Sequence, residues 1–190
     1  TTACKWDSVI DLELMWEQLK RVIKPNGAIV MTASQPFTSI LVASHIKGYK
    51  HHWIWKKNRG TGFQVAKYRP MMQTEDIIAF TAKGDRVNYY PQKIKLDKPV
   101  TYSNASSSNG TNPLANFNKG KKTVTDKFPL NVIEIKQQSK PIHPTQKPVA
   151  LMEYLINTYT NEGETVLDFT CGSGTTGVAA KNLNRKFIGI

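Results

Sequence analysis

A glycine-rich turn near the end of the chain carries the strongest chemical signal in the sequence. The apolar run 165–169 leads into Gly172-x-Gly174-x-x-Gly177, and a helical pattern follows. Glycines permit a tight turn and let a ligand approach the backbone, while the start of a helix offers free amide donors. The Gly-Lys-Ser/Thr of a phosphate-binding P-loop does not follow at the required spacing. The turn therefore predicts a nucleotide-like ligand at the carboxyl end of a strand.

Asp168 ends the predicted strand directly before the turn and bears on the choice between two ligands. A carboxylate here would repel the pyrophosphate of a dinucleotide, whereas it can face the cationic amino group of S-adenosylmethionine. The acidic residue that would hold the ribose is expected about 20 residues further along, beyond Ile190. NAD bound by an oxidoreductase of the same glycine spacing stays open as the alternative.

Two segments hold the surplus positive charge of the 190-residue chain, whose net charge is +12. Residues 47–69 contain seven bases, no acid and five interleaved aromatic residues, and residues 85–148 contain eleven bases and four acids. Lysine and arginine opposite phosphates release condensed counterions, so a face that binds nucleic acid is expected, with solvated loops as the alternative. The candidate DNA contacts are Lys56, Lys57, Arg59, Lys67, Arg69, Lys119, Lys121 and Lys122.

The composition argues against several other classes. Purely apolar runs reach four residues, far below the roughly 18 of a membrane helix, and no secretion signal opens the chain. We therefore expect a cytoplasmic protein without a membrane partner. Cys4 and Cys171 lie at opposite ends, and His45, His51 and His52 have no partnering ligand at metal-site spacing. Neither a disulfide framework nor a metal site is expected.

The apolar periodicity predicts alternating helices and strands at both ends of the chain, which indicates an α/β fold with a largely parallel sheet. A basic loop is expected at 57–70, and an inserted, mostly irregular subdomain is expected at 84–140. Within it, residues 102–118 are rich in Ser, Asn and Gly and are expected to form a mobile loop. Trp53 and Trp55 are expected in the core rather than stacked on bases. The predicted helices are 9–23, capped by Asp7 or Ser8, then 36–48, 147–159 and 174–183; the predicted strands are 27–32, 50–56, 74–81, 164–169 and 186–190.

Two motifs in this order resemble a known family, the DNA amino-methyltransferases that modify adenine N6 or cytosine N4. Asp168-Phe169-Thr170-Cys171-Gly172-Ser173-Gly174-Thr175-Thr176 resembles its cofactor motif, although that family usually has proline and phenylalanine where Phe169 and Thr170 stand. His143-Pro144-Thr145-Gln146-Lys147-Pro148, followed by a helix, resembles its second cofactor-binding motif. The resemblance implies S-adenosyl-L-methionine as cofactor, bound by His143, Thr145, Gln146, Lys147, Asp168, Phe169, Thr170, Cys171, Gly172, Ser173, Gly174, Thr175 and Thr176.

The position of the glycine turn late in the chain resembles the circularly permuted β-group of this family. The resemblance implies a Rossmann-like methyltransferase sheet, mostly parallel, with helices on both faces and an irregular insertion. Residues 1–84 would form the catalytic half, 85–140 the target-recognition insertion and 141–190 the cofactor half. The catalytic Asp-Pro-Pro-Tyr occurs nowhere in the sequence, and family order places it before Thr1. The catalytic residues therefore stay unassigned, and the fragment alone is expected to be inactive.

The activity that the resemblance implies is site-specific methylation of double-stranded DNA. A base swung out of the duplex would be methylated on its exocyclic amine. Adenine N6 is expected in preference to cytosine N4. Catalysis would come from positioning the amine against the methyl donor, without a metal. Ser34-Gln35-Pro36-Phe37 would either line the base pocket or only begin a helix. A homodimer and a cognate restriction endonuclease are further expected partners. A DNA-binding module without catalysis is the other alternative.

Overall fold

The structure, a computed structural model, describes residues 9–82, 86–103, 121–143 and 145–190. They fall into two compact units. The first unit runs to Tyr90 and resumes at Leu130, and the second is Pro91–Pro129. The second unit lies inside the segment predicted as an insertion. The division of the chain into catalytic, recognition and cofactor parts stays a prediction.

A four-stranded mixed sheet forms the centre of the first unit, in the order β1-β3-β2-β6. β3 runs antiparallel to both β1 and β2, and β6 runs parallel to β2. The predicted α/β class is confirmed, but the described sheet is not largely parallel. The ten residues between β2 and β3 are fewer than a parallel crossover needs, so these strands pair antiparallel. The strands are β1 (Ile29–Ala33), β2 (Tyr49–Thr61), β3 (Met72–Phe80) and β6 (Val132–Glu134).

A separate parallel pair, β7 (Thr165–Asp168) and β8 (Lys186–Gly189), carries the predicted strand–helix–strand at the end of the chain. α4 (Thr175–Asn182) connects these two strands, and α3 (Val149–Tyr159) precedes them. All four elements lie within two residues of the predicted bounds. The pattern of a short apolar strand followed by glycines and a helix was therefore sufficient to locate them.

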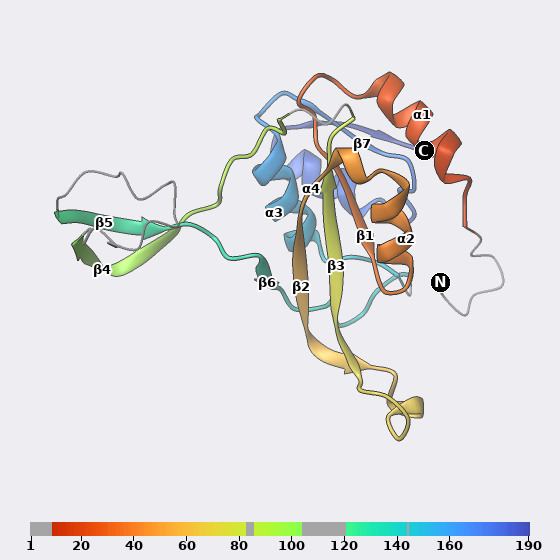
Figure 1. The fold of residues 1–190 in the computed structure, drawn as a ribbon, viewed down its shortest axis with the longest axis horizontal. Coiled ribbons are helices and arrows are strands. Elements are labelled where there is room, and N and C mark those ends of the chain that lie inside the picture. The colour runs from red at the N-terminus through yellow and green to blue at the C-terminus, as the bar shows by residue number, and fades with distance from the viewer. Residues whose placement is uncertain (1–8, 83–85, 104–120, 144) are drawn as a thin grey trace, which may run out of the picture. The chain divides into compact units, whose positions relative to one another are not determined.

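Helices cover both faces of the mixed sheet, as predicted (Figure 1). On one face, α3 packs on a cluster that contains Ile77 and Ala79 of β3. On the other, α1 (Leu12–Val22) and α2 (Phe37–Ser44) pack on a cluster that contains Ile78 and Phe80. Successive residues of a strand point to opposite faces. Residues 77–80 of β3 are all apolar because this part of the strand is buried on both faces of the sheet.

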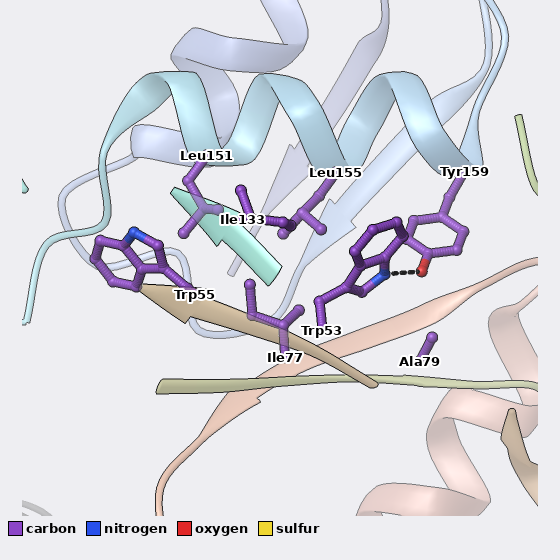
Figure 2. Packing of buried hydrophobic residues seen from close by; sticks show 8 residues of the cluster. All are labelled: Trp53, Trp55, Ile77, Ala79, Ile133, Leu151, Leu155 and Tyr159. Atoms are coloured by element: carbon purple, nitrogen blue, oxygen red, sulfur yellow. Dashed lines mark hydrogen bonds between the residues drawn. The ribbon is translucent and has the colours of Figure 1, made fainter. Parts of the chain in front are cut away.

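The first of these clusters holds both predicted core tryptophans (Figure 2). Trp53 and Trp55 are 3% and 2% exposed, which confirms the prediction that they are core residues. Trp53 also donates a hydrogen bond from Nε1 to Oη of Tyr159 at 2.7 Å, and the same hydroxyl lies 2.7 Å from Nε2 of His51. Burial raises the pKa of Tyr159 and lowers the pKa of His51. Both side chains are therefore held in their neutral forms.

The hairpin of β2 and β3 extends beyond the rest of the sheet as a two-stranded arm (Figure 1). β2 continues to Thr61, which pairs with Met72, so the first part of the predicted basic loop is in fact strand. Residues 57–61 show no apolar alternation because their side chains lie largely outside the core. The pairing partner supplied by β3 holds them extended. A short 3-10 helix, Phe63–Val65, lies at the connection.

The first two helices are shorter than predicted. α1 begins after Asp11, whose Oδ1 accepts hydrogen bonds from the backbone N–H groups of Glu13 and Leu14. The predicted caps at Asp7 and Ser8 lie outside the described residues. α2 ends at Ser44 and is followed by a separate 3-10 helix, Ile46–Gly48. Of the helices in the described ranges, none is long and apolar enough to cross a membrane.

In the residues that the structure describes, the second unit contains a two-stranded antiparallel ribbon, β4 (Ile94–Ser103) with β5 (Lys121–Lys127). These two strands are more regular than the mostly irregular subdomain predicted for 84–140, whereas the loop predicted at 102–118 lies largely outside the described residues. Thr101 and Thr123 lie opposite each other, with their hydroxyl oxygens 2.9 Å apart. Most side chains of the ribbon are exposed, which is why its sequence lacks the apolar periodicity of a buried strand.

Replacing the buried hydroxyl of Tyr159 tests the packing of α3 on the sheet. Tyr159→Phe leaves the indole N–H of Trp53 without its acceptor, which costs about 1–3 kcal/mol of the free energy of unfolding. Urea denaturation of both proteins measures the difference. Tyr49→Phe is the matched control, since it removes a hydroxyl from an exposed hydrogen bond to His52 and is expected to cost less than about 0.5 kcal/mol. Equal costs for the two variants would contradict the prediction.

Candidate functional site

The glycine turn after β7 has the backbone conformation that its sequence predicts. Gly172 and Gly174 adopt positive φ angles of 47° and 73°, a region that residues with side chains rarely occupy. Gly177 is needed for a different reason, because a Cβ there would lie 2.8 Å from the ring of Phe187 on β8. The first two glycines therefore shape the turn, and the third lets α4 pack closely on β8.

The carboxylate of Asp168 is held in a fixed orientation at the start of this turn. Its Oδ2 accepts a hydrogen bond from Oγ1 of Thr176 at 2.6 Å, and its Oδ1 accepts one from the backbone N–H of Thr170 at 3.0 Å. The side chain is half-buried. The turn thus presents a negative group beside the N-terminus of α4, an arrangement that suits a ligand with a cationic centre and hydrogen-bonding groups.

The second predicted cofactor motif, consisting of His143 and residues 145–148, is called the histidine loop here. The loop is closed on itself, because the backbone N–H of Gln146 donates to the carbonyl oxygen of His143 at 3.0 Å. Oγ1 of Thr145 lies 2.9 Å from Nδ1 of His143. The side chain of Gln146 donates through Nε2 to Oγ1 of Thr175, the first residue of α4, at 3.4 Å. The structure therefore brings the two motifs together. Pro144 lies outside the described residues.

Three other residues of the glycine motif have structural contacts. Phe169 packs against the apolar cluster beneath α1 and α2. Cys171 has a free, half-buried thiol, and its backbone N–H donates to the carbonyl oxygen of Ile190 at 3.2 Å. The hydroxyl of Ser173 lies 3.2 Å from Oγ1 of Thr175. The side chain of Phe169 is thus partly buried against the core, while Ser173 and Thr175 border the turn.

Lys147 and Lys57 are both engaged by a carboxylate that the sequence reasoning did not identify. The Nζ of Lys57 lies 2.9 Å from Oε2 of Glu75, and the Nζ of Lys147 forms an ion pair with Oε1. Both ammonium groups also lie over the ring of Trp55, at 5.0 and 5.8 Å from its centroid. Lys57 was predicted to contact phosphate and Lys147 to contact the cofactor. Their ammonium groups pair with Glu75 in this structure, and the two predicted contacts stay predictions.

Burial and ion pairing act in opposite directions on Glu75. Its burial raises the pKa of the carboxyl, but the two lysines outweigh this effect, so that the pKa lies below its ordinary value of 4.5. The residue was missed because a single glutamate at the start of an apolar strand forms no motif. The period of two places Glu75 on the same face as Ile77, and this was the available signal that it would be buried.

The remaining predicted DNA contacts are distributed over both units. Arg59, Lys67 and Arg69 are exposed on the arm. Lys56 is exposed and forms an ion pair with Glu134 of β6, with Nζ 2.9 Å from Oε1. Lys121 and Lys122 begin β5 in the second unit, where both are exposed, and Lys119 lies outside the described residues.

A pocket opens at the carboxyl end of β1. Ser34 and Gln35 follow this strand and line the pocket, and Phe37 begins α2, as expected of a segment that starts a helix. That the pocket receives a base stays a prediction. Asp76 accepts a hydrogen bond at Oδ2 from Oγ1 of Thr38 at 2.7 Å. The pocket is lined by Ser34, Gln35, Met72, Thr74, Glu75 and Asp76. Within the described ranges, no group of three or more His, Cys, Asp or Glu side chains is arranged to hold a metal ion.

Comparison with known proteins gives consistent matches over almost the whole chain. A family model for N6/N4 methyltransferases, described as DNA methylase, matches residues 5–190. The chain is 29% identical to the type II methyltransferase M.HpaI of Haemophilus parainfluenzae, with 92% of the chain and 52% of the relative covered. It is 28% identical to the DNA adenine methyltransferase YhdJ of Escherichia coli, with 97% and 64% covered. The chain thus spans between about half and two thirds of these relatives.

The fold of the chain is also similar to that of a solved structure. The chain superposes on the crystal structure of the M1.HpyAVI–SAM complex with a TM-score of 0.61 and 30% sequence identity. The superposition covers 92% of this chain and 74% of the other. The predicted methyltransferase fold is therefore confirmed. The permuted order stays a prediction.

The ion pairs of Glu75 predict a specific pH dependence of stability. Because the folded-state pKa of Glu75 lies below 4.5, its stabilisation is fully present above that pH and is lost as the pH falls through the folded-state pKa. In urea denaturation, the stability difference between wild type and Glu75→Gln should therefore narrow in acid. Glu134→Gln, which removes the exposed pair with Lys56, serves as control and should show a small difference. A Glu75→Gln difference that is constant with pH would contradict the assignment.

Proposed function

Since the chain belongs to the N6/N4 DNA methylase family, whose model matches residues 5–190, we propose that it is part of a DNA methyltransferase that uses S-adenosylmethionine. The contact between Gln146 and Thr175 carries this proposal, because it joins the histidine loop to the glycine turn. The glycine spacing alone does not distinguish this cofactor from NAD. Together the two motifs form two sides of one site, as a cofactor with an amino-acid part and a nucleoside part requires.

The residues of the glycine turn fit the proposed cofactor. The open backbone at Gly174, where a Cβ would meet no atom within 4 Å, leaves room for a ligand against the turn. Asp168 offers its fixed carboxylate to the cationic amino group, and Thr175 and Ser173 offer hydroxyl groups. Gln146 orients the histidine loop toward the same turn. In this proposal, Lys147 holds the loop in place through Glu75 instead of touching the cofactor.

The proposed reaction needs positioning above all. S-adenosylmethionine, when bound, would supply a methyl group to the amine nitrogen of the base, with S-adenosylhomocysteine as the leaving group and the proton of the amine released to water. The pocket lined by Ser34, Gln35 and Asp76 is the proposed place for the base. Its side chains offer amide, hydroxyl and carboxylate groups to the edge of a base. Holding two reactants in line removes much of the entropic part of the barrier.

The proposed DNA contacts are the exposed basic residues of the arm together with the start of β5. Arg59, Lys67 and Arg69 lie on the arm with their side chains exposed, where phosphates of a duplex can reach them. Such contacts position the duplex without reading its sequence. Lys57 is left out of the proposed contacts because its ammonium group forms an ion pair with Glu75. The prediction from the sequence that Lys119 contacts DNA is kept in this proposal.

The proposed target is adenine N6, a choice that rests on family frequency and on the name of one relative, the DNA adenine methyltransferase YhdJ. Mass spectrometry of nucleosides from DNA treated with the full-length protein separates N6-methyladenine from N4-methylcytosine. N6-methyladenine is expected. Detection of N4-methylcytosine instead would mean that the target base is cytosine, while the protein would still be a DNA methyltransferase. The homodimer and the cognate endonuclease remain predictions.

Charge removal at Asp168 tests the cofactor site. In calorimetric titrations of the full-length protein with S-adenosylhomocysteine, Asp168→Asn should bind about tenfold more weakly, which corresponds to about 1.4 kcal/mol. The control is Asp126→Asn, which alters an aspartate of β5 that is paired with Lys93 and should leave the dissociation constant within about twofold. Absence of binding by wild type at millimolar ligand, or thermal stabilisation by NAD instead, would overturn the proposed cofactor.

Neutralising the arm tests the proposed DNA contacts. The double variant Arg59→Gln/Lys67→Gln should lower the slope of log affinity against log salt by about 2, since each phosphate contact contributes roughly 0.9. Fluorescence anisotropy with a random-sequence duplex at several salt concentrations measures this slope. Lys20→Gln with Lys181→Gln, which removes two exposed lysines from α1 and α4, should leave it unchanged. An unaltered slope in the arm variant would place the DNA elsewhere.

A further inference from the structure

One carboxylate at the base of the arm is shared by two lysines from distant parts of the chain. Glu75 lies on β3, Lys57 lies on the neighbouring β2, and Lys147 belongs to the histidine loop. Oε2 of Glu75 pairs with Lys57 at 2.9 Å, and Oε1 pairs with Lys147. Each oxygen is thus committed to a different segment. If the carboxylate moves, both segments lose a partner.

The surroundings of this carboxylate leave little room for rearrangement. The side chain of Glu75 is 10% exposed, and those of Lys57 and Lys147 are 14% and 24% exposed. The ring of Trp55 forms an aromatic surface under both ammonium groups and lies at the edge of the buried cluster (Figure 2). Its Nε1 donates to the carbonyl oxygen of Ile135 at 2.8 Å. A carboxylate withdrawn from water is costly unless it stays paired, so these groups are expected to move together.

The shared carboxylate connects the two proposed binding elements. On one side, the backbone carbonyl oxygen of Lys57 accepts a hydrogen bond from Nε2 of Gln73 at 3.0 Å, across the two strands of the arm. On the other side, Lys147 directly follows Gln146, whose side chain reaches Thr175 in the glycine turn. A continuous set of contacts therefore runs from the arm to the turn.

We propose that Glu75 is a positioning residue that couples the binding of DNA by the arm to the binding of cofactor by the histidine loop. This inference rests on the proposed function. A duplex that fixes the arm also fixes Lys57, then the carboxylate of Glu75, and then Lys147 with its loop. The cofactor meets a loop that is already ordered and binds with a smaller loss of entropy. By linkage, the cofactor must strengthen DNA binding by the same factor.

The neighbouring pair of Lys56 and Glu134 provides a matched control. It also joins β2 to another segment through one ammonium group and one carboxylate, with Nζ and Oε1 2.9 Å apart. Its side chains are 45% and 68% exposed, however, and exposed pairs of this kind contribute little. Removing the charge of Glu134 alters the surface near the arm without affecting the carboxylate shared by Lys57 and Lys147.

The experiment measures the coupling directly in the full-length protein. The affinity for S-adenosylhomocysteine is determined by calorimetry with and without a saturating random-sequence duplex, and the ratio of the two affinities is the coupling factor. Wild type and Glu134→Gln should show a factor of at least about five. Glu75→Gln should reduce it to about one. Lys57→Met, which leaves Glu75 paired with Lys147, should also reduce the coupling factor to about one. This second variant keeps the test possible if Glu75→Gln folds poorly.

Each outcome separates this inference from the function on which it rests. If wild type fails to bind S-adenosylhomocysteine, or fails to bind the duplex, the proposed function fails. If wild type binds both ligands independently, Glu75 couples nothing and the inference alone fails. Retention of the wild-type coupling factor in folded Glu75→Gln or in Lys57→Met also overturns it. A purely structural role would lower the melting temperature of Glu75→Gln and leave the coupling factor at its wild-type value.

Discussion

The alternation of side chains along β3 organises most of the first unit. Even-numbered residues such as Ile78 and Phe80 face α1 and α2, and odd-numbered residues such as Ile77 face α3. The same alternation places Glu75 on the α3 face, two residues before the apolar run, where Trp55 and two lysines meet it. The buried part of β3 thus begins with a charged residue. The pairing that this charge requires ties the arm and the histidine loop to the sheet.

Strand direction explains why the candidate site lies where it does. β1 and β2 both run antiparallel to β3, so their carboxyl ends lie at the end where β3 begins. The pocket at Ser34 and Gln35 follows β1, and the arm is the continuation of β2. Lys147 reaches the same end through Glu75 and brings the histidine loop with it. Ligands of open α/β sheets characteristically bind beyond the carboxyl ends of strands, which agrees with the proposed reaction between a base and a methyl donor.

The basic residues of this chain serve two physical purposes that net charge alone does not separate. Exposed residues such as Arg59 and Lys67 keep their charge available to solvent and to a polyanion. Lys57 and Lys147 instead form ion pairs with a buried carboxylate. These ion pairs are stronger than exposed ones because less water screens the charges. In the proposed enzyme, the first group attracts the duplex and the second transmits its presence to the cofactor loop.

The sequence alone determined the α/β class, the glycine turn and the family resemblance, because each depends on local periodicity or on contiguous residues such as Gly172 and Gly174. It also placed both tryptophans of β2 in the core. It did not determine the pairing of β1 with β3 or the partners of Lys57, since these depend on residues far apart in the chain. The length of the arm was missed because residues 57–61 lack apolar alternation. Only the tertiary structure decided that Glu75 joins β2 to the histidine loop. A buried charge is neutralised by whichever opposite charge the fold brings near, and sequence spacing does not encode that distance.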